Sequence, residues 1–197
     1  MELDKALESR HSVRSFKNKN VSWKDLLEAV DAASYAPFAD ARNHIKCIII
    51  ENKEKISKIA ELANQSWISQ APALIVVCSD DTNLEKMHGH RGRVYSRQQS
   101  GAAIENILLK LTELGLATCW VGSYEDELIK ELLKIPGHIQ LEALLPVGYE
   151  SGKAKSSRKK ALESIIRWGD WDTNKKPPVF KEALGPPYTL EGQRMRK

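Results

Sequence analysis

Apolar residues recur every three or four positions in five stretches of the chain, which is the spacing of amphipathic helices. In the longest stretch, Ala103, Ile107 and Leu111 share one helical face. Ser22 is suited to cap the start of one helix, and Gly115 is suited to follow the end of the longest one. The pattern therefore predicts helices over residues 1–9, 22–35, 53–62, 94–115 and 125–133.

Four shorter segments are nearly all apolar and favour buried strands. They cover residues 45–51, 73–79, 117–121 and 139–147. Because these strands alternate with the helices, we expect an α+β or α/β sandwich around one sheet. From Lys175 onwards both periodicities are lost, and two Pro pairs favour extended backbone. The expected organisation is one domain over residues 1–172 and an extended tail over 173–197, which is frayed or lies on a partner subunit.

Composition and charge narrow the class of protein. With 197 residues and 42% hydrophobic content, the chain is long enough to bury one core. Residues 151–197 carry 12 basic and 5 acidic side chains, whereas residues 1–150 carry 18 and 21. This distribution indicates a local anion site or a solvated tail rather than a nucleic-acid-binding face.

Several features predict a cytoplasmic protein without a membrane segment. The N-terminus lacks the apolar core of a signal peptide, and no apolar run approaches the roughly 18 residues of a membrane span. Cys47, Cys78 and Cys119 are odd in number and have no CxxC spacing, which favours reduced thiols.

The clearest candidate for chemistry is the run of residues 10–14, which we call the basic segment. Arg10 and Arg14 provide two permanently charged guanidiniums and Ser12 provides a hydroxyl, so together they could clamp a phosphate. The alternative is a solvated loop with ordinary surface arginines. A second candidate is Gly122, which follows a predicted strand and would let a flat ligand approach the backbone. The alternative there is an ordinary connection between strand and helix.

Other motifs give weaker evidence for a binding or catalytic site. Residues 148–153 resemble a P-loop, but only three residues separate the glycines and Ala154 replaces the expected hydroxyl residue. There is no GxGxxG motif, and the cysteines lack an evident histidine partner. His88 and His90 lack a third metal ligand at a recognisable spacing, and we interpret residues 88–90 as a polar loop rather than a metal site.

Taken in order, seven motifs resemble the nitroreductase family of flavin-dependent oxidoreductases over residues 2–171. They are RHSVRSF, YAPFADARN, APALIVVC, GAAIENILLKLTELGL, ATCWVG, LLPVGY and SSRKKALESIIRWGDW. The resemblance implies an FMN-binding homodimer with an α+β sandwich, a central and mostly antiparallel sheet flanked by helices, and the flavin at the subunit interface.

The resemblance also implies which residues bind the cofactor. The basic segment and two C-terminal cations would hold the phosphate, and the turn after strand 117–121 would face N5 of the flavin. A loop of the other subunit would lie near the ring, and one glutamine would reach its pyrimidine edge. In that loop Phe38 stands where many relatives have Ser, so the acceptor is not specified. Gln99, just before GAAIENILLKLTELGL, stands where the family usually has Asp. The set is Arg10, His11, Ser12, Arg14, Pro37, Phe38, Asn43, Gln65, Val121, Gly122, Ser123, Arg158 and Lys160.

The implied reaction has two steps. NADH or NADPH would deliver hydride to the flavin and leave, and a nitro compound, a quinone or a similar conjugated acceptor would then take electrons in the same pocket. The flavin performs the chemistry, so we assign no catalytic side chain and no metal. Two alternatives remain: a related flavin reaction (reductive dehalogenation or flavin fragmentation), and a non-enzymatic protein whose basic tail binds nucleic acid or an acidic partner.

Overall fold

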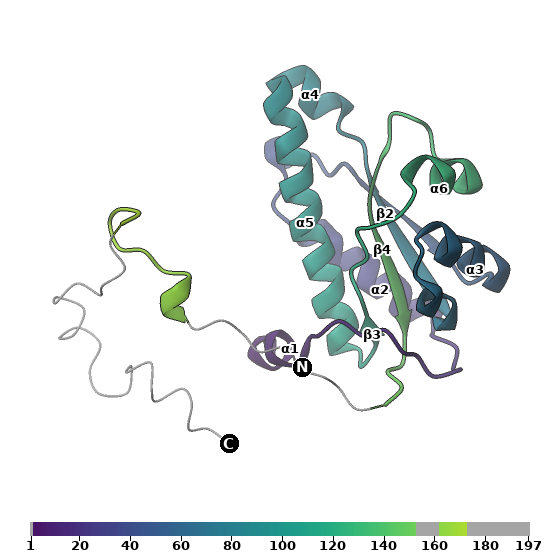
Figure 1. Cartoon of the computed structure of the whole chain (residues 1–197). Helices are drawn as coiled ribbons and strands as arrows, with labels where there is room; N and C mark the ends of the chain where they lie inside the picture. Colours follow the sequence, from purple (N-terminus) through teal and green to yellow (C-terminus); the bar gives the residue numbers. More distant parts are fainter. Residues whose placement is uncertain (1, 153–161, 173–197) are drawn as a thin grey trace, which may run out of the picture. The chain divides into compact units, whose positions relative to one another are not determined.

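The structure describes residues 2–152 and 162–172, and the first of these ranges contains one antiparallel sheet. In this computed structural model the strands lie in the order β1–β2–β4–β3, so the two longest occupy the centre (Figure 1). The predicted α+β class with a mostly antiparallel sheet is confirmed. The strands are β1 (Ile45–Ile50), β2 (Ala73–Ser79), β3 (Ala117–Thr118) and β4 (Gln140–Gly148).

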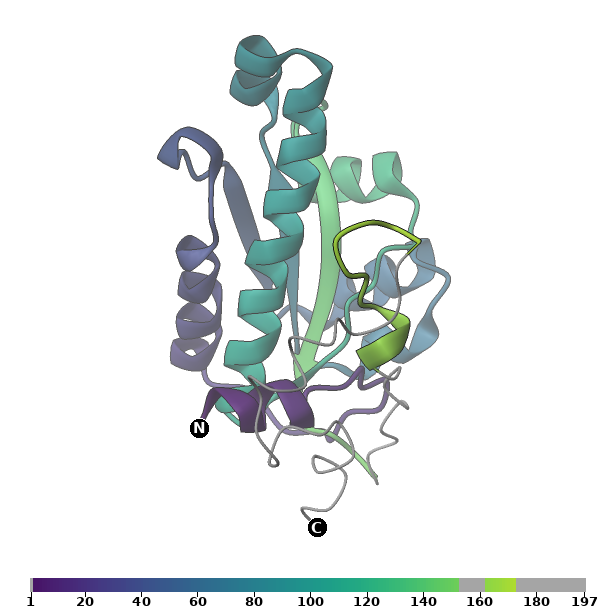
Figure 2. The same ribbon diagram turned by 90° about the vertical axis from the view of Figure 1, so that its left-hand side faces the viewer.

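Helices cover both faces of the sheet. On one face lie α2 (Trp23–Asp31) and α5 (His90–Glu113), and on the other lie α3 (Lys53–Leu62) and α6 (Asp126–Leu133) (Figures 1 and 2). Two short helices, α1 (Leu3–Ser9) and α4 (Thr82–His88), contact α5. Three 3-10 helices span Ala32–Tyr35, Ala39–Ala41 and Ser66–Gln70.

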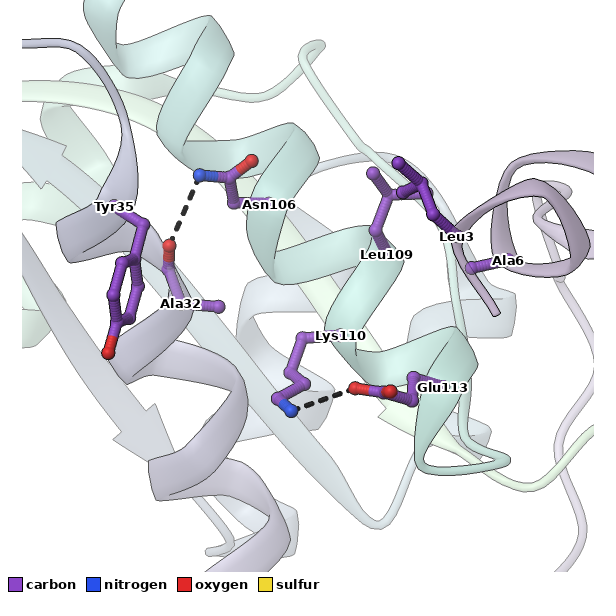
Figure 3. Close-up of a pocket in the computed structure, with 8 residues that line it drawn as sticks. All are labelled: Leu3, Ala6, Ala32, Tyr35, Asn106, Leu109, Lys110 and Glu113. Carbon is purple, nitrogen blue, oxygen red and sulfur yellow. Dashed lines mark hydrogen bonds and ion pairs between the residues drawn. The ribbon is translucent and has the colours of Figure 1, made fainter. Parts of the chain in front are cut away.

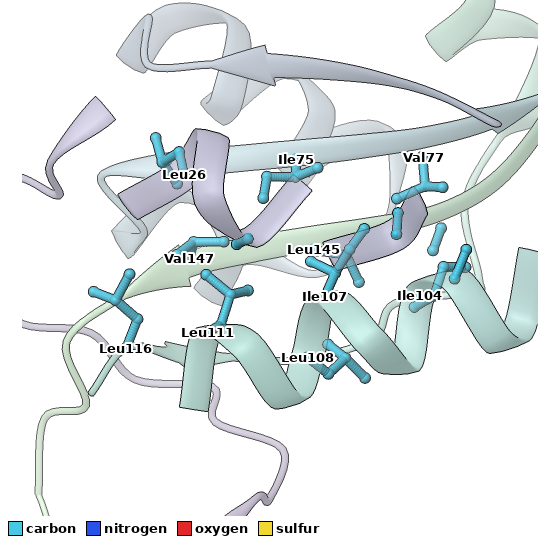
Figure 4. Packing of buried hydrophobic residues seen from close by; sticks show 14 of the residues in the cluster. Leu26, Ile75, Val77, Ile104, Ile107, Leu108, Leu111, Leu116, Leu145 and Val147 are labelled. Carbon is cyan, nitrogen blue, oxygen red and sulfur yellow. The ribbon is translucent and has the colours of Figure 1, made fainter. Parts of the chain in front are cut away.

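Coverage on both sides explains why β2 is apolar at nearly every position. All seven of its residues are buried, as expected for a strand with helices on both faces. Successive side chains point to opposite faces, so Ile75 and Val77 belong to the core cluster between the sheet and α5, together with Ile104 and Leu111 (Figure 4). Leu74 and Val76 join the second core, beneath α3 and α6.

The predicted helix ends are confirmed at two positions. The Ser22 hydroxyl accepts a hydrogen bond from the Lys24 amide at 3.2 Å and caps α2. After α5, Gly115 adopts a left-handed φ of +73°, and the Leu116 amide donates to the Leu111 carbonyl at 2.8 Å. This is a Schellman ending, which stops the longest helix and turns the chain into β3.

Several boundaries differ from the sequence prediction. The helix predicted over residues 22–35 changes to 3-10 geometry at Ala32, and the strand predicted over 117–121 pairs as a strand only at its first two residues. The polar loop predicted at residues 88–90 is wrong. His88 ends α4 and His90 begins α5, and Gly89 forms the turn between them with a φ of +56° that an L-residue rarely adopts.

The chain that follows α1 pairs with two segments that come much later in the sequence. Ser12 forms a parallel bridge with Thr118, and Phe16 forms an antiparallel bridge with Glu150. Gly148 permits this close approach, because a Cβ there would lie only 2.9 Å from Cδ1 of Phe16. The basic segment is thereby fixed beside β3 and the end of β4.

Residues 162–172 form a separate unit that we describe by itself. It contains a 3-10 helix over Leu162–Ser164, and the Arg167 guanidinium lies 5.6 Å from the centre of the Trp171 ring. No helix in the described parts of the chain is long and apolar enough to cross a membrane. The predicted tail over 173–197 lies outside the described residues.

Candidate functional site

The basic segment, predicted to clamp a phosphate, leaves α1 and runs alongside β3. Arg10 caps the C-terminus of α1, and the Val13 amide donates to the Thr118 carbonyl at 3.0 Å. Ser12 and Arg14 are exposed, whereas Val13 between them is buried. Burial of Val13 therefore anchors the segment and leaves the polar side chains on its outer side.

Cys119 lies directly after β3, near the basic segment. Burial raises the pKa of its thiol, while the charges of Arg14 and Arg10 and a hydrogen bond with Ser12 oppose the rise. The cationic side chains of the basic segment therefore lie close enough to the end of β3 to favour a negative charge there.

Two contacts hold the guanidiniums in place. Nε of Arg10 lies 3.2 Å from a carboxylate oxygen of Glu105 on α5. The Arg14 guanidinium lies 5.9 Å from the centre of the Trp67 ring, within the range of a cation–π contact. The Trp67 ring in turn stacks on Phe16 at 6.5 Å between centroids.

His11 connects the basic segment to the chain beyond β4. Its Nδ1 lies 2.7 Å from the Ser9 carbonyl oxygen, and its Nε2 lies 3.1 Å from Oε1 of Glu150. Hydrogen bonds to these two acceptors raise the pKa of His11 above its ordinary value.

A second group of predicted residues comes together at the turn after β3. Both backbone polar groups of Val121 are used by Leu144, through two hydrogen bonds of 3.0 Å. Val121 therefore positions the turn and has no backbone group to offer a ligand. Gln65 precedes Ser123 by 58 residues, and its Nε2 donates to the Ser123 carbonyl at 3.3 Å. The structure thus brings Gln65 next to Ser123, so the two residues are close enough to bind the same ligand.

Gly122 is open to an approaching group. It is exposed, and a Cβ built on it would meet nothing closer than Nε1 of Trp120 at 4.0 Å. Within the described residues, no acceptor takes the backbone N–H of Gly122 or Ser123. A flat ring could therefore reach two backbone donors here.

These residues fit a ligand with a phosphate at one end and a flat ring at the other. The basic segment provides positive charge, and Gly122 provides unhindered backbone donors. In addition, Oγ1 of Thr118, the bridge partner of Ser12, is buried and has no hydrogen-bond partner in the described structure. An unsatisfied buried hydroxyl is costly unless a ligand or water completes it.

The structure does not bring Pro37, Phe38 and Asn43 to this site. They lie in the connection between α2 and β1, near the end of the sheet where β1 pairs with Ser79. The basic segment lies by Thr118, whose partner Val147 pairs with Ala73 at the opposite end of β2. A role for these three residues therefore requires a second copy of the chain.

The 37–44 loop also has unusual features of its own. Asp40 and Ala41 both take left-handed φ values, +54° and +53°, which are uncommon for residues other than glycine. The His44 ring lies edge-on to Phe38 at 5.6 Å, and both of its nitrogens are buried without a partner. Asn43 is used locally, since its Oδ1 accepts from the Ile45 amide at 2.9 Å.

Sequence reasoning missed three residues that shape the site: Glu105, Glu150 and Trp67. Glu105 lies 95 positions from Arg10 and Glu150 lies 139 positions from His11, so no local pattern links them. The two C-terminal cations, Arg158 and Lys160, lie outside the described residues.

A groove of about 340 Å³ lies elsewhere, between α1, α5 and the 3-10 helix after α2 (Figure 3). Its walls are partly apolar, and Lys110 and Glu113 form an ion pair of 2.8 Å at its edge. It contains none of the predicted cofactor residues. Its lining residues are Leu3, Ala6, Ala32, Tyr35, Asn106, Leu109, Lys110 and Glu113.

A family model and several known proteins match the part of the chain that contains the candidate site. The nitroreductase family model matches residues 7–69 and 57–149, which include the basic segment and the Gly122 turn. A protein of Methanothermobacter thermautotrophicus, provisionally named NADH dehydrogenase/NAD(P)H nitroreductase, is 32% identical over 154 residues, covering 76% of this chain and 78% of its own. The FMN reductase [NAD(P)H] of Bacillus subtilis is 26% identical over 180 residues, covering 83% and 72%.

Solved structures show the same fold. The oxidoreductase YcnD of Bacillus subtilis, described in its structure as hypothetical, superposes with a TM-score of 0.79. The match covers 87% of this chain and 75% of that one, at 24% sequence identity.

Proposed function

Because the chain belongs to the nitroreductase family, we propose that it is an FMN-dependent oxidoreductase. It passes electrons from NADH or NADPH to a small conjugated acceptor, such as a nitro compound or a quinone. The observation that carries the proposal is that the basic segment is bridged to β3, whose following turn has an open glycine. The names of relatives, which include an FMN reductase that uses NAD(P)H, support the same assignment.

The chain's own residues bind and orient the cofactor. Arg10 and Arg14 neutralise the phosphate, and the Ser12 hydroxyl adds a hydrogen bond. The N–H groups of Gly122 and Ser123 donate to the N5 side of the ring, where they stabilise negative charge. When bound, FMN supplies the capacity to accept a hydride and to pass electrons on.

Gln65 and two C-terminal cations complete the proposed site. Gln65 lies beside the Gly122 turn, from which its amide would reach the pyrimidine edge. Arg158 and Lys160 are proposed to close the phosphate end. One pocket then serves the nicotinamide and the acceptor in turn, which requires ping-pong kinetics.

The proposed active form is a homodimer. Pro37, Phe38 and Asn43 can act at a flavin only if the other subunit brings them there, as the separation along the sheet shows. Large apolar side chains are exposed on α1, α2 and the following 3-10 helix and support such an interface: Leu3, Leu7, Trp23, Leu27 and Tyr35. A cytoplasmic location stays a prediction; the three cysteines are free, in agreement with it.

Anaerobic titration tests the proposal. Purified protein should be yellow or should become so with FMN, and NADH or NADPH should bleach the flavin absorbance. Reoxidation by nitro compounds, quinones and halogenated aromatics then identifies the acceptor and separates the dehalogenase alternative. Protein that takes up no FMN and binds DNA in a strongly salt-dependent way would contradict the proposal and favour a basic binding protein.

A further inference from the structure

We propose that His11 is a positioning residue for the phosphate end of this site, where its imidazolium neutralises the Glu150 carboxylate beside the basic segment. Loss of the His11 proton would leave that carboxylate uncompensated and weaken the binding of FMN. The inference rests on the proposed function.

The two contacts of the His11 ring are hydrogen bonds at the same time only when both ring nitrogens carry a proton. Nδ1 faces the Ser9 carbonyl oxygen at 2.7 Å, and Nε2 faces Oε1 of Glu150 at 3.1 Å. A carbonyl and an ionised carboxylate only accept hydrogen bonds, and a neutral imidazole has only one N–H to donate. Both contacts are therefore made at once only by the imidazolium.

The negative groups around His11 favour its protonated form, and Arg10 opposes it. The Ser9 carbonyl belongs to the last turn of α1, where the partial negative charge of a helix end favours a cation. Glu150 lies on the chain beyond β4, and the charge of Arg10, the neighbouring residue, opposes protonation. The hydrogen bonds outweigh burial and Arg10, so the pKa of His11 is raised above its ordinary value.

Glu150 is held in place independently of this pair. Its backbone forms the bridge with Phe16, and the Ser151 amide donates to the Ser15 carbonyl at 2.9 Å. When His11 is neutral, Glu150 therefore remains close to the basic segment as an unpaired negative charge. Because its pKa is raised, His11 keeps its proton to a higher pH in the folded protein than a free imidazole does, and FMN binding weakens as the pH rises through that raised pKa.

Two single variants separate this electrostatic role from a merely structural one. His11→Gln leaves Glu150 uncompensated at every pH, so FMN affinity should be low and independent of this titration. Glu150→Gln removes the unpaired charge, so its affinity at about pH 9 should exceed that of the wild type by roughly two- to fivefold, the range of partly exposed ion pairs. If the His11–Glu150 pair served only to hold these two segments together, both variants would bind FMN more weakly than the wild type at every pH.

The experiment is FMN fluorescence titration of the wild type and both variants from about pH 7 to about pH 9, where the phosphate is mainly dianionic. Riboflavin, which lacks the phosphate, is the ligand control and should show no difference between wild type and Glu150→Gln at high pH. Glu85→Gln is the matched protein control, because it removes one carboxylate from a 2.7 Å pair with Arg93 at the other end of α5.

The expected result is that wild type and His11→Gln agree near pH 9, while Glu150→Gln binds FMN more tightly. Equal pH profiles in wild type and His11→Gln, or weaker binding by Glu150→Gln at high pH, would overturn the inference while leaving the proposed function intact. Failure of the wild type to bind FMN at any pH would overturn both.

Discussion

Substitution of Arg10 by Ala should weaken FMN binding far more than it destabilises the cofactor-free protein. In the cofactor-free state Arg10 is paired with Glu105 at 3.2 Å, and the two side chains are 33% and 43% exposed. An ion pair this exposed contributes about 0–1 kcal/mol to stability. A charged hydrogen bond to a phosphate is worth about 1.5–3 kcal/mol, or roughly a ten- to hundredfold change in affinity. The variant also leaves the negative charge of Glu105 close to the phosphate, which adds to the loss.

The assay compares two quantities for each variant. Urea unfolding of the cofactor-free protein gives the change in stability, and fluorescence titration gives the FMN dissociation constant. Arg93→Ala is the control, since Arg93 forms an exposed pair with Glu85 and lies outside the site. Unchanged FMN affinity in Arg10→Ala would refute the phosphate clamp, and a stability loss well above about 1 kcal/mol would show that Arg10 has a structural role instead.

Three further predictions concern stability and reactivity. Gly148→Ala should lower the free energy of unfolding by about 1–3 kcal/mol in urea, because the new Cβ would lie 2.8 Å from Cδ of Pro72 and 2.9 Å from Cδ1 of Phe16; unchanged stability would contradict the close packing of both residues on Gly148. Leu111→Ala should cost about 2–5 kcal/mol by the same assay, since Leu111 is fully buried between α5 and the sheet, and a loss below about 1 kcal/mol would contradict that packing. Burial raises the pKa of Cys78 to about 11, and its side chain is buried, so this thiol should not react with iodoacetamide at about pH 8 until the protein is unfolded, as mass spectrometry can check; rapid labelling of Cys78 in the folded protein would contradict this burial.

The secondary structure was largely predictable because its strongest signals are local. The predicted boundaries of α3 and β2 are those of the structure, since each is a clean apolar pattern with clear ends. α4 was missed because only Leu84 of its seven residues is buried, which leaves no periodicity to detect. β3 is shorter than predicted because its apolar residues continue into an irregular turn where only Val121 pairs again, with Leu144.

The candidate site was predictable in its residue types but not in its pairings. The motif around Arg10 and Ser12 could be identified from adjacent letters, and so could the turn at Gly122. The carboxylates of Glu105 and Glu150 could not, because their proximity depends on how helix and strand are stacked rather than on any nearby sequence. The separation of Phe38 from the rest of the site could not be predicted either, because it depends on how the strands pair and in which direction they run.

The placement of residues 12–16 has a consequence for biosynthesis. This stretch bridges Thr118 and Glu150, which are translated more than a hundred residues after it. Contacts of such long sequence separation form only after the intervening chain has been made. The nascent polypeptide therefore cannot assemble its proposed phosphate-binding end during most of translation, and cofactor capture must follow the emergence of β4.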